Sequence, residues 1–135
     1  MTITEDDRIL LINHRLQKTD ELVVEIRLHI ENGHYNTAVN RIYYGMFYMV
    51  SALALMKGFT TSKHFQLIGW FNKTFVKEGL VDKKFGRILN TAFEMRTKGD
   101  YDDFIHYKQN DVVTLYNEML EFINIIKIII SKKIE

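Results

Sequence analysis

The stretch from Ala38 to Met56 constrains the fold most, because it is apolar on nearly every side over several helical turns. A helix of that composition has to be buried. Small residues recur along it at every seventh place, at Ala38, Gly45 and Ala52. Glycine inside a helix costs roughly 1 kcal/mol relative to alanine, so Gly45 indicates a place where a neighbouring backbone comes close. We therefore expect this stretch to be the central helix.

The composition predicts an all-α protein with one domain, residues 1–135. The chain has no proline and only seven glycines, so it lacks the strongest helix breaker and has few turn signals. Apolar residues make up 47% of it, which is enough for one sizeable core. The sequence therefore favours a helical bundle in which successive helices run antiparallel.

Apolar residues spaced three and four apart mark helices on both sides of the central one. We expect Gly99 to end the fourth helix, and residues 100–107 to form a polar and aromatic connection to the last. The five predicted helices begin near Thr4, Ala38, Ser62, Asp82 and Asn110.

Charge and cysteine content exclude several classes of function. Without cysteine the chain has no disulfide framework and no thiolate nucleophile, so nothing requires an oxidising compartment and we expect a cytoplasmic protein. The acidic start at Glu5, Asp6 and Asp7 is unlike a secretory signal. A net charge of +1 argues against a surface that coats nucleic acid broadly. Any polyanion would have to be bound locally.

The final stretch of the chain carries more apolar residues than one helix groove needs. Apolar residues between Val112 and Ile130 follow a heptad-like spacing along one face of the predicted helix. Further apolar residues, such as Val113 and Ile128, widen that face. Lys127 interrupts the run, which is also too short to span a bilayer. We therefore expect a homodimer that covers this surface, and no membrane contact.

Several polar residues stand out as binding candidates. Arg41 and Tyr44 share an amphipathic stripe, which suits either a salt bridge beside buried rings or an arginine stacked on aromatics at a binding site. Arg96 continues the inward face of the fourth helix, where a guanidinium needs a partner. The structural alternative for Arg96 is a cation at the helix end that bonds the last carbonyl oxygens or pairs with Asp100. Lys63 and His64 open the third helix in a locally basic half of the chain. The structural alternative for His64 is a core imidazole.

Separated blocks of the sequence, in order, together resemble the HEPN family from about Asn32 to Phe104. The match is specific because several blocks occur in sequence, whereas any one could arise by chance. The blocks are Ala38–Phe47, Lys63-His64, Phe71, Phe75–Leu80, Phe85–Asn90, Ala92–Arg96 and Asp100–Phe104.

The resemblance implies an antiparallel bundle of four long helices plus a shorter one, usually dimeric. Members are often encoded beside a small nucleotidyltransferase in prokaryotic toxin–antitoxin pairs, and many are ribonucleases that need no metal. Their motif is an Arg followed four to six residues later by a His, set at the dimer cleft. In such a pair His can move the proton of the 2′-hydroxyl or of the leaving oxygen, and Arg can hold the phosphate.

This chain departs from that motif. Asp100 and Tyr101 stand where the His should follow Arg96, and the next imidazole, His106, lies ten residues on. The subgroup that the chain most resembles has Arg-x-x-x-Asp-Tyr here. We predict Arg96, Tyr101 and His106 as catalytic candidates, with no cofactor and no metal. The predicted binding residues are Arg96, Asp100, Tyr101, Arg41, Tyr44, Lys63 and His64.

Two kinds of function stay open at this point. The first is a nucleotide- or RNA-binding partner of a nucleotidyltransferase, which either cleaves RNA without a metal or only binds it. The second is a non-catalytic helical module that interacts with another protein. The adjacent gene separates them, because the first function predicts that it encodes a nucleotidyltransferase.

Overall fold

The computed structural model describes residues 3–134, which fold into helices with no strand among them. Four long helices and a short one confirm the predicted all-α bundle. The elements in order are α1 (Glu5–Glu31), α2 (Tyr35–Met56), α3 (His64–Phe71), the π-helical segment η1 (Asn72–Lys77), α4 (Lys83–Tyr101) and α5 (Gln109–Ile134).

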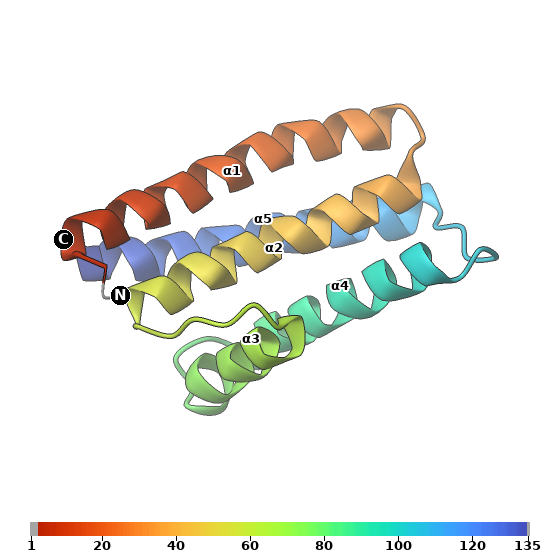
Figure 1. Ribbon diagram of the computed structural model, residues 1–135. Coiled ribbons are helices and arrows are strands. Elements are labelled where there is room, and N and C mark those ends of the chain that lie inside the picture. The colour runs from red at the N-terminus through yellow and green to blue at the C-terminus, as the bar shows by residue number, and fades with distance from the viewer. Residues whose placement is uncertain (1–2, 135) are drawn as a thin grey trace.

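Helix α2 is the centre of the bundle and packs against α1, α3, α4 and α5. Successive long helices run antiparallel, whereas α2 and α5 lie side by side and run in the same direction (Figure 1). Ala38, Gly45 and Ala52 are all buried, as predicted for the central helix. The stretch that is apolar on nearly every side is therefore the one that other helices surround.

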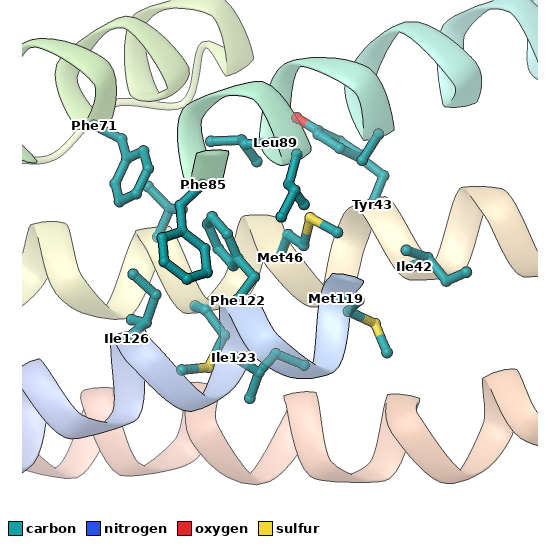
Figure 2. Close-up of a cluster of buried hydrophobic side chains, with 14 of the residues drawn as sticks. Ile42, Tyr43, Met46, Phe71, Phe85, Leu89, Met119, Phe122, Ile123 and Ile126 are labelled. Carbon is teal, nitrogen blue, oxygen red and sulfur yellow. The ribbon is translucent and has the colours of Figure 1, made fainter. Parts of the chain in front are cut away.

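Buried side chains of α2, α4 and α5 cluster with Phe71 at the end of α3 (Figure 2). The ring of Phe122 on α5 lies 5.5 Å from that of Phe71 and 6.2 Å from that of Phe85. On α1 the one polar position of the apolar face, Thr19, is fully buried, and its hydroxyl donates to the Arg15 carbonyl oxygen at 3.0 Å. This hydrogen bond offsets the cost of removing the hydroxyl from water.

The small residue Gly45 has a different neighbour from the one expected. A Cβ atom placed there would lie 3.4 Å from Sδ of Met119 on α5. The close contact is therefore a side chain of the neighbouring helix rather than its backbone. The prediction of tight packing at Gly45 holds, and the long, flexible methionine supplies it.

One predicted helix changes its type along its length, and one helix end differs from the prediction. After Phe71 the third helix widens into η1, whose Asn72 and Val76 face Gly86 of α4. The fourth helix continues through Gly99 to Tyr101, so the prediction that Gly99 ends it was wrong. Gly99 serves packing instead, because a Cβ there would lie 3.1 Å from Cε2 of Tyr107.

Candidate functional site

The guanidinium of Arg96 lies against two tyrosine rings of α2. Its Cζ is 5.7 Å from the ring centre of Tyr43 and 5.4 Å from that of Tyr44, both within the range of cation–π attraction. Nη2 also donates to the Tyr44 hydroxyl at 3.0 Å. The side chain is only 17% exposed, so these contacts hold a charge that is largely removed from water.

Asp100 lies one helical turn after Arg96 and faces the same side of α4. Its Oδ2 is 3.2 Å from Arg96 Nε and accepts from Nδ2 of Asn40 on α2 at 2.9 Å. The Nε–H of Arg96 is not aligned with that oxygen and has no hydrogen-bond partner. The contact is therefore an ion pair that leaves one guanidinium donor unused.

His64, the first residue of α3, extends the site. Its ring stacks on Phe47 with centres 4.3 Å apart, and Nδ1 lies 2.7 Å from the Tyr43 hydroxyl. Burial, and secondly the charge of Arg96, lower the pKa of His64 below its usual value. The imidazole is therefore neutral at pH 7 and adds no charge beside Arg96.

The protonation of Tyr43 assigns the tautomer of His64. Burial raises the pKa of the Tyr43 phenol far above its usual value, against a smaller lowering by Arg96. The hydroxyl therefore keeps its proton, and we infer that it donates to Nδ1. In a neutral imidazole whose Nδ1 accepts, the proton is on Nε2. His64 thus presents an uncharged N–H donor.

The loop that follows α4 is tied to the start of α2. Asn36 donates to the Ile105 carbonyl oxygen at 2.8 Å and accepts from the Tyr107 N–H at 2.9 Å. The Tyr107 hydroxyl donates to the Met95 carbonyl oxygen at 2.7 Å. These bonds fix the end of α4, which carries Arg96 and Asp100, against α2, which carries Tyr44.

The structure brings together some of the predicted site residues. Arg96, Asp100, Tyr44 and His64 form one cluster through the contacts above. Lys63 immediately precedes His64 and is exposed, so it lies at the rim of the cluster.

Other predicted residues lie apart from the cluster or face solvent. Tyr101 follows Asp100 but its side chain is 78% exposed. Arg41 turns to α1, where its Nε is 3.1 Å from Oε2 of Glu25, which matches the salt-bridge interpretation. His106 lies on the loop that follows α4 and lines a separate hollow that includes His34.

Sequence reasoning missed three members of the cluster: Asn40, Tyr43 and Phe47. They share one face of α2 with Tyr44, at steps of three and four. The prediction instead followed the adjacent stripe through Arg41 and Tyr44. Because α2 is apolar almost all round, periodicity alone does not show which of its faces meets the arginine of α4.

Two properties of residues 3–134 bear on the classes of function considered. Within that range, no three histidine, aspartate or glutamate side chains are grouped so that they could hold a metal ion. None of its helices combines the length and the apolar character that crossing a membrane requires.

Comparison with known proteins identifies the family. The model of the HEPN domain matches residues 12–129. The chain is 39% identical to a "UPF0332 protein" of Thermotoga maritima over 102 residues, which are 76% of this chain and 77% of that protein. It is 38% identical over 101 residues to a "Putative toxin" of Methanocaldococcus jannaschii, covering 74% of this chain and 69% of the other. The chain therefore belongs to the HEPN family.

Proposed function

We propose that this protein binds RNA or a nucleotide through a phosphate at Arg96, as a member of a prokaryotic toxin–antitoxin pair. Two relatives from Methanocaldococcus jannaschii, 38% and 32% identical to this chain, carry toxin names, and that supports the biological setting. The chemistry of the Arg96 cluster supports the ligand class.

One observation carries the proposal, namely that Arg96 is held in place without using all its donors. The rings of Tyr43 and Tyr44 position the guanidinium, while the Nε–H has no hydrogen-bond partner. Asp100 neutralises the charge from one side through a misaligned contact. A phosphate with its oxygens in the guanidinium plane would accept two aligned bonds, which is the stronger arrangement.

Arg96→Gln tests this proposal. We expect the variant to stay folded and to lose about 1–3 kcal/mol of binding free energy for single-stranded RNA, the range for a charge-assisted bond. Fluorescence anisotropy with a labelled oligouridylate measures it. Lys127→Gln is the control, because it removes another cation that is paired with a carboxylate, Asp20 at 2.7 Å, on other helices. Unchanged binding in Arg96→Gln would favour the non-catalytic interaction module instead.

A second candidate function is cleavage of RNA without a metal, and the Nε2–H that His64 presents near Arg96 favours it. As the 2′-hydroxyl gives its proton to water and its oxygen attacks phosphorus, this N–H can donate to a phosphate oxygen. Arg96 would stabilise the charge that gathers on the phosphate. The 5′-oxygen then leaves and takes a proton from an acid or from water. Tyr101 and His106 remain predicted catalytic residues for that proton transfer.

The cleavage proposal is tested by incubating the protein with total RNA in the presence of a chelator. Cleavage that persists with the chelator and is lost in His64→Leu, which removes the N–H donor, supports it. Tyr101→Phe and His106→Gln examine the two predicted proton donors separately. If the wild-type protein leaves RNA intact under all conditions, the protein binds without cutting.

We also propose that the protein acts as a homodimer. Val113, Leu120 and Ile128 are exposed apolar residues seven and eight apart on α5, so they follow one line along that helix. Burial of such a line between two copies would remove it from water. Leu120→Glu should shift a dimer to a monomer in sedimentation experiments, whereas a wild-type monomer at micromolar concentration contradicts the proposal.

A nucleotidyltransferase is the proposed protein partner. The family resemblance and the toxin-named relatives support this assignment. If the adjacent gene encodes such an enzyme, co-expression should yield a complex that copurifies through a tag on either chain. Separate elution of the two proteins at micromolar concentration would rule the pairing out.

A further inference from the structure

A cavity of about 480 Å³ lies between α1, α2 and the loop before α3, and His64 forms part of its lining. Phe47 contributes an apolar wall. The remaining lining is polar and contains no acidic residue. It consists of Arg15, Ser51, Thr60, Thr61, Ser62 and His64.

Arg15 is the charged group of this cavity. It is half-buried and pairs with no carboxylate within residues 3–134, unlike Arg41 and Arg96, which each have one. Its Nε atom is buried without a hydrogen-bond partner. A guanidinium donor that is withdrawn from water and left unpaired is unfavourable. An anion bound at the terminal nitrogens would balance this unpaired charge.

The neutral groups around Arg15 suit an anion too. Ser51, Thr60 and Ser62 offer hydroxyl donors that can rotate toward an oxygen acceptor. His64 adds its Nε2–H, since the Tyr43 hydroxyl occupies Nδ1. With one positive charge, several neutral donors and no carboxylate, the lining matches a phosphate better than a cation or an apolar ligand.

The cavity and the Arg96 cluster have side chains in common. His64 lines the cavity and packs on Tyr43 with ring centres 5.7 Å apart. Tyr43 in turn contacts the Arg96 guanidinium. Phe47 also belongs to both, because it lines the cavity and stacks on His64. Two cationic groups thus flank one aromatic stack.

We propose that the Arg15 cavity binds a second phosphate of the single-stranded RNA whose first phosphate lies at Arg96. This inference rests on the proposed function, and it specifies how that ligand is held. An RNA strand with one phosphate at Arg96 and the next at Arg15 would pass over the stacked rings of His64 and Phe47. Its affinity would then depend on salt through two arginines rather than one.

The experiment compares Arg15→Gln with Arg8→Gln by anisotropy of a labelled oligouridylate at several salt concentrations. Arg8 is a matched control: it is seven residues earlier on the same face of α1, and its Nε is also buried without a partner, but it does not line this cavity. We expect Arg15→Gln to bind about tenfold more weakly and to reduce the salt slope by roughly 0.7, the value for one phosphate contact of a single strand. Arg8→Gln should match the wild type.

Arg96→Gln in the same series separates the two proposals. If it weakens binding while Arg15→Gln equals Arg8→Gln, the cavity proposal is overturned and the Arg96 site stands. If only Arg15→Gln weakens binding, the cavity is supported and the Arg96 site fails. If neither variant weakens binding, both proposals fail.

A second variant covers the case in which Arg15→Gln does not fold. Thr60 is exposed, so Thr60→Glu should be tolerated while it places a carboxylate beside the proposed phosphate. It should weaken RNA binding, whereas Thr114→Glu, which adds the same charge at an exposed position of α5, should not. Equal binding by the two variants contradicts the proposal. Titration of inorganic phosphate, followed through the His64 ring signals, gives an independent readout that Thr60→Glu should abolish.

Discussion

Asp100 lies four residues after Arg96 on α4 and brings its Oδ2 to 3.2 Å from Nε without an aligned hydrogen bond. The same oxygen accepts from Asn40 at 2.9 Å. Asp100 therefore balances the charge of Arg96 but does not accept a hydrogen bond from its Nε–H. A phosphate that approaches Arg96 has to compete with this carboxylate, which makes Asp100 a determinant of affinity.

Asp100→Asn should strengthen the binding of single-stranded RNA several-fold, because it removes the competing negative charge. The free energy of unfolding should fall by about 1–3 kcal/mol, because the variant leaves a guanidinium that is only 17% exposed without its counter-charge. Anisotropy and thermal unfolding measure the two effects. Weaker RNA binding in Asp100→Asn would mean that the carboxylate positions Arg96 instead of competing for it.

Gly45→Leu should destabilise the fold by about 1–3 kcal/mol, because the added side chain meets Sδ of Met119, only 3.4 Å from a Cβ at that position. Gly69→Leu is the control. Gly69 is exposed on α3, and a Cβ placed there would have no atom within 4 Å. Chemical denaturation gives both values. A Gly45→Leu variant as stable as wild type would show that Met119 moves aside freely.

Gly86→Ala should cost about 1–2 kcal/mol of stability, although alanine favours a helix by about 1 kcal/mol over glycine. A Cβ at Gly86 would lie 2.7 Å from Oδ1 of Asn72 and 3.2 Å from Val76 of η1. The Asn72 side chain would have to turn away and lose its bond to Asn90. Gly69→Ala, which meets no such neighbour, should instead be neutral or stabilising. Equal stabilities of the two alanine variants would exclude close packing of η1 on α4.

His64 should make the protein less stable in acid. Its pKa is lowered from 6.5 by burial and then by Arg96, so the unfolded chain binds the proton more tightly than the folded one. The stability that neutral His64 contributes is therefore fully present above about pH 6.5 and is lost as the pH falls through the lower folded-state pKa. The Tm of His64→Gln should fall less than that of wild type over this range.

The control for this titration is His106→Gln, which removes an exposed imidazole from the loop before α5. Its Tm, measured over the same pH range, gives the effect of removing an imidazole outside the cluster. Nuclear magnetic resonance of the ring protons gives the His64 pKa directly. A value at or above 6.5 would refute the proposed neutral state beside Arg96.

Helix positions were largely predictable because they depend on local sequence. Asp82 caps α4 as expected, and its carboxylate accepts from the Lys84 N–H at 2.9 Å. Gly58, which follows the end of the central helix, has a φ of 79°, which suits glycine. Such features depend only on residues that are close in the sequence, so the sequence alone is enough to predict them.

The site was only partly predictable, because its members come from three helices. Arg96 was identified by its place on an apolar face, whereas Tyr43 and Phe47 resembled ordinary core residues. The role of Gly99 was misjudged, since its constraint comes from Tyr107, which lies beyond the helix in sequence but packs on it in space. Contacts of that kind depend on how the helices pack against one another, and the periodicity of apolar residues does not reveal that packing.

The tie between Asn36 and the loop at Ile105 and Tyr107 also has a consequence for biosynthesis. It joins residues that are 69 and 71 positions apart, so it can close only after α3 and α4 have been made. A nascent chain that ends before Tyr107 contains Arg96 and Tyr44 but not the bonds that hold their helices in register. The arginine site therefore matures late in translation, and a prematurely terminated chain would lack it even with all of its aromatic residues present.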